Sequence, residues 1–404
     1  MKTFRDCGLA ALAVLLALAM LELGLRAAGS KFEASLYEPH PQLHAVLRPN
    51  AQGWTVKEGE SFVRINSLGM RDRERLVEAA PATIRIAFLG DSMVAAQQVP
   101  LEGTMTQVLE RRLSQVLVKA GRNVEVLNFA VGGYALSQFD LALEERVWRF
   151  RPDIVAVCVS GLTVPNSNRR TKSLDDIPLF TLDGGRLVPD PGNRPPAGTS
   201  EESRRWHRIL GDLHNRSRIL QLVRAAQQSN WRNAFVLSKA AVPVAAEPKP
   251  AEFMRVWPYR PPDDPELAKA WQITEAILSR MVASAREHGA EFWLIQIGND
   301  IEEDPRDAER EQFLRINALA DFKYASKRYA AFAARNGVSF LYLAPPMRDY
   351  SARTGAPLRG FFNTKPYEGH WNEAGNFAAA SVIAKELLRS SQIFASLKPD
   401  SNGE

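Results

Sequence analysis

Ser92 and His370 are the two residues whose types and positions best suit chemistry on an acyl group. Ser92 closes a Gly-Asp-Ser turn, directly after an apolar run and just before a stretch with helical spacing. His370 lies in a loop shortly before the last stretch with helical spacing. A serine hydroxyl becomes a nucleophile when a histidine within hydrogen-bond reach takes its proton. The pair therefore indicates nucleophilic catalysis, although a Gly-Asp-Ser alone is often only a turn or a helix cap.

The other histidines have no comparable placement, and we expect them on the surface or in packing contacts: His40, His44, His207, His214 and His288. Asn372 directly precedes the last helical stretch, where an asparagine side chain caps free N–H groups. We therefore expect Asn372 to be the N-cap of that helix.

The elements that must bring Ser92 and His370 together form an alternation of apolar strands and helices. Continuous apolar runs predict strands over residues 84–89, 124–127, 154–159, 292–297 and 338–343. Helical spacing between them predicts helices over residues 104–117, 141–150, 267–286, 321–335 and 372–388. This alternation predicts a parallel sheet with helices on both faces. Ser92 and His370 both fall at the carboxyl edge of that sheet, where ligands bind in open α/β folds.

A long insertion interrupts this alternation after the third strand. Within it, residues 179–188 predict a small hairpin around Asp183-Gly184-Gly185. A basic amphipathic helix is predicted over residues 201–228, and its polar side carries Arg204, Arg205, Arg208, Arg216, Arg218 and Arg224. We favour a solvated helix face over a contact with anionic lipid for these arginines.

The chain is therefore divided into four parts. Residues 1–30 form a membrane anchor or signal sequence, and residues 31–80 form an extended lead-in. Residues 81–395 form one catalytic domain, with an insertion over residues 163–265 that acts as a lid. Residues 396–404 form a C-terminal tail.

The N-terminus predicts export. Lys2 and Arg5 precede an uncharged run over residues 7–21, which continues past Glu22 until Arg26 closes it. This length is near the minimum for a helix that spans a membrane. We favour an uncleaved anchor with the rest of the chain in the periplasm or outside the cell. The alternative is a signal sequence that is cleaved before the protein is secreted.

Composition excludes several other functions. The net charge of +5 is spread along the chain, without a basic motif interleaved with aromatic residues, so we expect no nucleic-acid partner. Cys7 and Cys158 are the two cysteines, and they lie in the apolar N-terminus and in a predicted buried strand. A disulfide between them is not expected. The sequence shows no metal-ligand cluster, nucleotide fingerprint or flavin motif, so we expect no metal and no cofactor.

Five short motifs, in order along the chain, resemble those of the SGNH hydrolase superfamily, and particularly its bacterial, membrane-anchored, GDSL-like members. They lie at residues 66–72, 86–92, 128–134, 152–155 and 369–372. The resemblance covers residues 60–390 without most of the insertion, and five motifs in order are far more specific than one. It implies a flavodoxin-like, three-layer α/β/α fold with a five-stranded, mainly parallel sheet. It also implies Ser92 as nucleophile, His370 as general base, and the N–H groups of Ser92 and Gly133 as the oxyanion hole.

The sequence departs from the family pattern in the oxyanion hole. The family usually places an asparagine just after the third strand, whereas Leu162 occupies that position here. Loss of one such donor typically raises the barrier by about 2.7–4 kcal/mol. The residues that could substitute for it are Asn166, Asn168 and Asn299.

A second departure concerns the acid that orients the histidine. The family usually has an aspartate three residues before the histidine, and Tyr367 stands there instead. Glu368 is the available substitute, because a carboxylate at that spacing can hold the imidazole tautomer. We therefore predict Glu368 as the third member of the triad.

The expected function is that of a serine esterase or deacetylase outside the cytoplasm, which acts on a small-molecule or carbohydrate ester through an acyl-enzyme on Ser92. Two alternatives stay open. One is an O-acyltransferase of an envelope or exported polysaccharide. The other is a degenerate protein that binds glycan or lipid, or scaffolds an assembly. The distance between the Ser92 and His370 side chains distinguishes them: hydrogen-bond reach favours catalysis, and separation beyond roughly 6 Å favours a binding protein.

Overall fold

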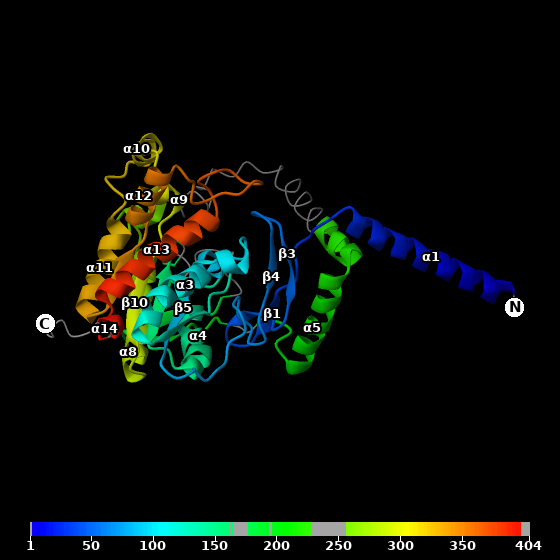
Figure 1. Ribbon diagram of the computed structural model, residues 1–404, viewed down its shortest axis with the longest axis horizontal. Coiled ribbons are helices and arrows are strands. Elements are labelled where there is room, and N and C mark those ends of the chain that lie inside the picture. The colour runs from blue at the N-terminus through cyan, green and yellow to red at the C-terminus, as the bar shows by residue number, and fades with distance from the viewer. Residues whose placement is uncertain (1, 162, 165–176, 194–195, 228–255, 397–404) are drawn as a thin grey trace.

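The structure is a computed structural model that describes residues 2–161, 163–164, 177–193, 196–227 and 256–396. At its centre lies a five-stranded sheet in the order β11-β10-β7-β5-β6, with every neighbouring pair parallel (Figure 1). Its strands are β5 (Thr83–Leu89), β6 (Asn123–Asn128), β7 (Ile154–Val159), β10 (Glu291–Gln296) and β11 (Ser339–Tyr342). The strand order reverses between β5 and β7. Flavodoxin-like folds bind ligands in the crevice at this point, outside the carboxyl ends of the strands. The predicted fold class is confirmed, with strand ends within about two residues of the expected ones.

Helices cover both faces of the sheet because successive strand residues point to opposite sides. Phe88 and Val126 face α3 and α13, whereas Leu89 and Val157 face α4, α8 and α11. The covering helices are α3 (Met105–Leu117), α4 (Leu136–Ala142), α8 (Pro265–Glu287), α11 (Tyr324–Asn336), α12 (Ala344–Thr354) and α13 (Glu373–Ser390). The helix predicted over residues 141–150 instead begins at Leu136, and its later part changes to a π-helix and then a 3₁₀ turn. Short helices complete the layers: α2 (Ser92–Ala95), α9 (Asp300–Glu303), α10 (Asp307–Ile316) and α14 (Gln392–Ala395).

The lead-in before the sheet consists of two antiparallel hairpins that the sequence pattern did not predict. They pair β1 (Tyr37–His40) with β2 (His44–Leu47), and β3 (Gln52–Thr55) with β4 (Ser61–Arg64). Leu47 and Val63 from these strands are buried in the same core cluster as the sheet residues. The lead-in therefore packs on the sheet, close to the edge where the candidate site lies.

The described part of the insertion contains the predicted hairpin, β8 (Phe180–Asp183) and β9 (Arg186–Pro189). The predicted long helix is divided in two. Helix α5 runs over Glu201–Arg216, Ser217 interrupts it, and helical structure resumes over residues 218–227. The predicted solvated face is also partly wrong, because Arg204 and Arg208 both pair with the buried Glu38 of β1.

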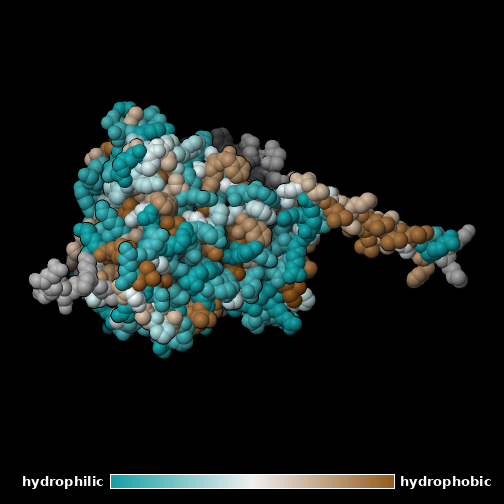
Figure 2. Space-filling view, in the orientation of Figure 1, coloured by the Kyte–Doolittle hydropathy of each residue, from teal (hydrophilic) through white to brown (hydrophobic). Residues whose placement is uncertain are grey.

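Helix α1 (Lys2–Ala27) projects from the body of the molecule (Figure 1). The stretch Phe4–Ala27 is long and apolar enough to cross a membrane, and it is brown along most of its length in Figure 2. Cys7 on this helix and the buried Cys158 are both free thiols.

Candidate active site

Ser92 is held in a tight turn between β5 and α2. Gly90 ends the strand at a point with no room for a side chain, because a Cβ there would lie 2.5 Å from Val94 Cγ2. Asp91 caps α2, and its Oδ2 also accepts a hydrogen bond of 2.7 Å from Ser160 Oγ at the end of β7. The turn is thus tied to the neighbouring strand, and Ser92 becomes the first residue of α2.

His370 reaches Ser92 from the loop before α13. Its Nε2 lies 2.8 Å from Ser92 Oγ. The loop is fixed on its far side by Asn372, whose Oδ1 caps α13 by accepting the Gly375 N–H at 3.1 Å. The predicted pairing of Ser92 with His370 is therefore present, and Asn372 is the predicted N-cap. A separation of 2.8 Å is within the hydrogen-bond reach that a general base requires.

Glu58 is the carboxylate that holds His370. Its Oε2 accepts a hydrogen bond from His370 Nδ1 at 2.9 Å and another from the His370 backbone N–H at 2.9 Å. The hydrogen bond from the imidazole lowers the pKa of the Glu58 carboxyl, so the carboxylate is charged at neutral pH. With the proton on Nδ1, Nε2 is left with a lone pair to accept the proton of Ser92 Oγ.

The prediction that Glu368 orients His370 is wrong. The imidazole has one N–H at Nδ1, and Glu58 takes it, whereas Glu368 is exposed. The acid is placed 312 residues before the histidine, in the turn between β3 and β4. One local signal accompanies it: Gly369 has φ of +81°, and a Cβ there would lie 2.6 Å from Glu58 Oε2. Only glycine lets the carboxylate approach this closely.

The turn that carries Glu58 is fastened to the loop before His370. Asn363 Oδ1 accepts the Gly59 N–H at 2.7 Å, and Asn363 Nδ2 donates to the Val56 carbonyl at 3.0 Å. Gly59 has φ of +65°, and a Cβ there would lie 2.5 Å from the Phe361 ring. These contacts fix the turn that carries the carboxylate to the loop before His370.

A buried ion pair between Arg359 and Glu303 supports the loop that carries His370. Arg359 Nε donates to Glu303 Oε2 at 2.8 Å, and its two other nitrogens donate to the carbonyls of Gly369 and Gly298, each at 2.7 Å. Trp371 Nε1 donates to the same Glu303 oxygen at 2.8 Å. The residues on both sides of His370 are thereby linked to α9, and the strength of charge-assisted hydrogen bonds makes this link rigid.

The turn that carries Gly133 lies against the turn that carries Ser92. The Val131 N–H donates to the Gly90 carbonyl at 3.2 Å, which brings the turn after β6 against the Ser92 turn. A Cβ on Gly132 would lie 3.7 Å from Ser92 Cβ, and the next residue, Gly133, has φ of +84° and is exposed. Among the described residues, neither the Ser92 N–H nor the Gly133 N–H donates a hydrogen bond to the protein. Both donors are thus available to a ligand, as an oxyanion hole requires.

Tyr37 is a second lead-in residue at the site, and no motif in the sequence indicates it. Its hydroxyl lies 2.8 Å from the position that a Cβ on Gly132 would take, next to Ser92. It exchanges hydrogen bonds with the Gln97 amide at 3.0–3.2 Å. Burial raises the pKa of Tyr37, so its hydroxyl keeps its proton and can act as a donor.

Of the residues named as substitutes for the family's asparagine, Asn166 and Asn168 lie outside the described residues, as does Leu162. Asn299 is described. Its side chain lies against Gly161 at the end of β7, and its Nδ2 donates to the Tyr259 hydroxyl at 2.7 Å. Asn299 follows the neighbouring strand β10 and precedes α9, and its amide is therefore held beside Gly161.

Comparison with known proteins gives likenesses of structure. No family model and no curated protein matches the sequence. Among solved structures, TesA is 13% identical with a TM-score of 0.35, covering 75% of this chain and 97% of its own. The acetyl xylan esterase AlAXEase is 14% identical with a TM-score of 0.37, covering 75% and 100%. A catalytic mutant of Axe2, an acetylxylan esterase from Geobacillus stearothermophilus, is 12% identical with a TM-score of 0.37, covering 76% and 93%. These chains are similar in fold alone.

Proposed function

We propose that the protein is a serine esterase that works outside the cytoplasm through an acyl-enzyme on Ser92. The observation that carries this proposal is the unbroken chain of hydrogen bonds from Ser92 Oγ through the His370 imidazole to the Glu58 carboxylate, with distances of 2.8 and 2.9 Å. A nucleophile, a base and an acid that fixes the base are the three parts that acyl transfer requires.

In the first half of the reaction, Ser92 Oγ attacks the carbonyl carbon of the ester while His370 Nε2 takes the hydroxyl proton. The Glu58 carboxylate stabilises the resulting imidazolium through the Nδ1–H hydrogen bond. The carbonyl oxygen becomes an oxyanion, which the N–H groups of Ser92 and Gly133 stabilise. His370 then gives its proton to the leaving alcohol as the carbon–oxygen bond of the ester breaks.

In the second half, a water molecule attacks the acyl-enzyme, and His370 takes the proton of that water. Ser92 leaves with the proton returned by His370, and the free acid departs. The candidate substrate is a small-molecule or carbohydrate ester, and α1 serves as the anchor that holds the catalytic part outside the membrane. The basic residues Lys2 and Arg5 before the apolar run support this orientation.

Hydrolysis of p-nitrophenyl acetate by the full chain in detergent or nanodiscs tests the activity. We expect saturable release of p-nitrophenol, because the triad is already assembled before any substrate binds. The amount of p-nitrophenol released should equal the amount of acetate formed when water is the only acyl acceptor. A rate no higher than that of buffer, from a folded protein and across several short acyl chains, would overturn the proposal.

A further inference from the structure

Helix α5 and the helical residues 218–227 expose an apolar stripe to the outside of the molecule. On α5 the stripe consists of Trp206, Ile209, Leu210 and Leu213, which share one helix face by their spacing. Leu210 is 60% exposed and Leu213 is 53% exposed. The stripe continues after Ser217 through Leu220, Leu222 and Val223. A contiguous apolar surface on an otherwise polar helix marks a contact with a partner or a membrane.

The opposite face of α5 is bound to the lead-in. Arg204 and Arg208 pair with Glu38 at 2.7–2.8 Å, and Asp212 pairs with the buried Arg48 at 2.5 Å. Glu38 directly follows Tyr37, whose hydroxyl lies against Gly132. Helix α5 therefore has a fixed orientation on the body, with its polar side inward and its apolar stripe outward.

The junction at Ser217 is fastened to the end of α1. Glu22, the one charged residue inside the apolar run, accepts the N–H groups of Arg218 and Ile219, each at 3.0 Å, and the Ser217 hydroxyl at 3.1 Å. Arg26 donates to the Arg216 carbonyl. Glu22 thus caps the helix over residues 218–227. Glu22 lies near the carboxyl end of the candidate span, so the junction falls at the membrane boundary when α1 crosses a membrane.

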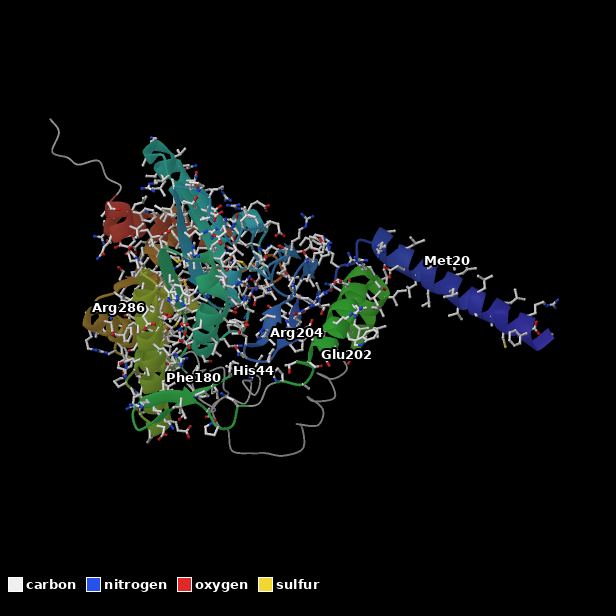
Figure 3. The ribbon with its side chains drawn as sticks, turned by 90° about the horizontal axis from the view of Figure 1, so that it is seen from below. Met20, His44, Phe180, Glu202, Arg204 and Arg286 are labelled. Atoms are coloured by element: carbon white, nitrogen blue, oxygen red, sulfur yellow. The ribbon has the colours of Figure 1, made fainter. Side chains whose placement is uncertain are left out.

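The arrangement of the helices suits a membrane surface. Helix α5 runs crosswise to α1 in two perpendicular views (Figures 1 and 3), so it lies along the membrane plane when α1 crosses the membrane. In Figure 2, brown atoms appear on the edge of α5 that faces the side from which α1 projects. Arg205, Arg216 and Arg224 are exposed along the same stretch and can reach lipid headgroups.

We propose that α5 and residues 218–227 lie in the headgroup region of the membrane that α1 crosses, with the apolar stripe in the lipid and the exposed arginines among the headgroups. The inference rests on the proposed anchoring by α1. Its consequence is that the lead-in, which carries Tyr37 and Glu58, is held at a fixed and short height above the lipid.

Depth-dependent quenching of a fluorophore in proteoliposomes tests the proposal. The full chain with Cys7→Ala and Leu210→Cys is labelled on the new thiol, because Cys158 is buried. It is then reconstituted into phosphatidylcholine vesicles with and without phosphatidylglycerol. The matched control is Glu287→Cys in the same background, at the exposed carboxyl end of α8, away from α1 in Figure 1. A third sample carries the label on the native Cys7 and reports whether α1 is inserted.

We expect severalfold stronger quenching of the label at position 210 than at position 287 by lipids with a spin label near the headgroup, and weak quenching of position 210 by aqueous iodide. Anionic lipid should increase the quenching of position 210 by the spin-labelled lipid. Strong iodide quenching at position 210, with Cys7 quenched by lipid, would show the stripe in water and overturn this inference while the anchor stands. Protection of position 210 from both quenchers would show that protein, such as a second copy, covers the stripe. A Cys7 label that lipid does not quench would overturn the anchor and this inference together.

Discussion

Replacement of Ser92 with alanine is expected to reduce hydrolysis of short-chain esters by on the order of 10⁴-fold or more. Replacement of His370 with alanine should have an effect of similar size, because the hydroxyl then has no base. The double variant should be little worse than either single variant, since residues that act as a unit are not additive. Initial rates with p-nitrophenyl acetate, together with thermal unfolding of each variant, measure this.

A second histidine variant tests whether the loss of activity is particular to His370. His207 is exposed, and its Nδ1 contacts the Ser203 carbonyl of its own helix, so His207→Ala should keep the activity of the parent. Thermal unfolding of Ser92→Ala should stay near that of the parent, because the lost group is small and lies at an open site. Full activity in either Ser92→Ala or His370→Ala would show that the chemistry takes place elsewhere.

Replacement of Glu58 with glutamine is expected to lower kcat/KM by about a hundredfold to ten-thousandfold with the fold retained. The amide can hold the wrong tautomer of His370 and cannot stabilise the imidazolium. Glu368→Gln is the matched control, with the same chemical change on an exposed carboxylate, and should remain within a factor of two. The kcat/KM of Glu58→Asp should fall between those of Glu58→Gln and Glu368→Gln, because the aspartate side chain is shorter by one methylene group.

The pH dependence of stability offers a second measurement on the same variants. The pKa of Glu58 is lowered in the folded protein, so its contribution to stability is present above the ordinary pKa of a glutamate and is lost as the pH falls through the lowered value. The difference in unfolding free energy between the parent and Glu58→Gln should therefore shrink on acidification.

Loss of activity in Glu368→Gln, with Glu58→Gln unchanged, would contradict the assignment of the acid.

The sheet and the Ser92–His370 pair could be predicted because their signals are local. Each strand is a continuous apolar run, and parallel strands bring their carboxyl ends to one edge, so two residues distant in sequence were placed at the same edge. Gly133 followed from a motif whose residues are consecutive. The exact ends of the helices were less well predicted, because Ser217 interrupts a periodic pattern that continues on both sides of it.

Glu58 and Tyr37 could not be predicted in the same way, because they belong to the lead-in. Its strands are four residues long and carry no extended period from which their packing on the sheet could be inferred. The side chain that reaches His370 is selected by tertiary contacts, such as the Asn363 bonds to the turn of Glu58. The role of Glu22 as a cap for residues 218–227 is hidden for the same reason, since its partners lie 195–197 residues away.

Labelling with a fluorophosphonate, followed by peptide mass spectrometry, is the most direct test of the triad. The reagent forms a covalent bond only with a serine that a neighbouring base activates. We expect one adduct on the peptide that contains Ser92, no adduct in Ser92→Ala, and much slower labelling in Glu58→Gln than in Glu368→Gln. An adduct on another residue, or equal labelling of the parent and Ser92→Ala, would contradict the triad.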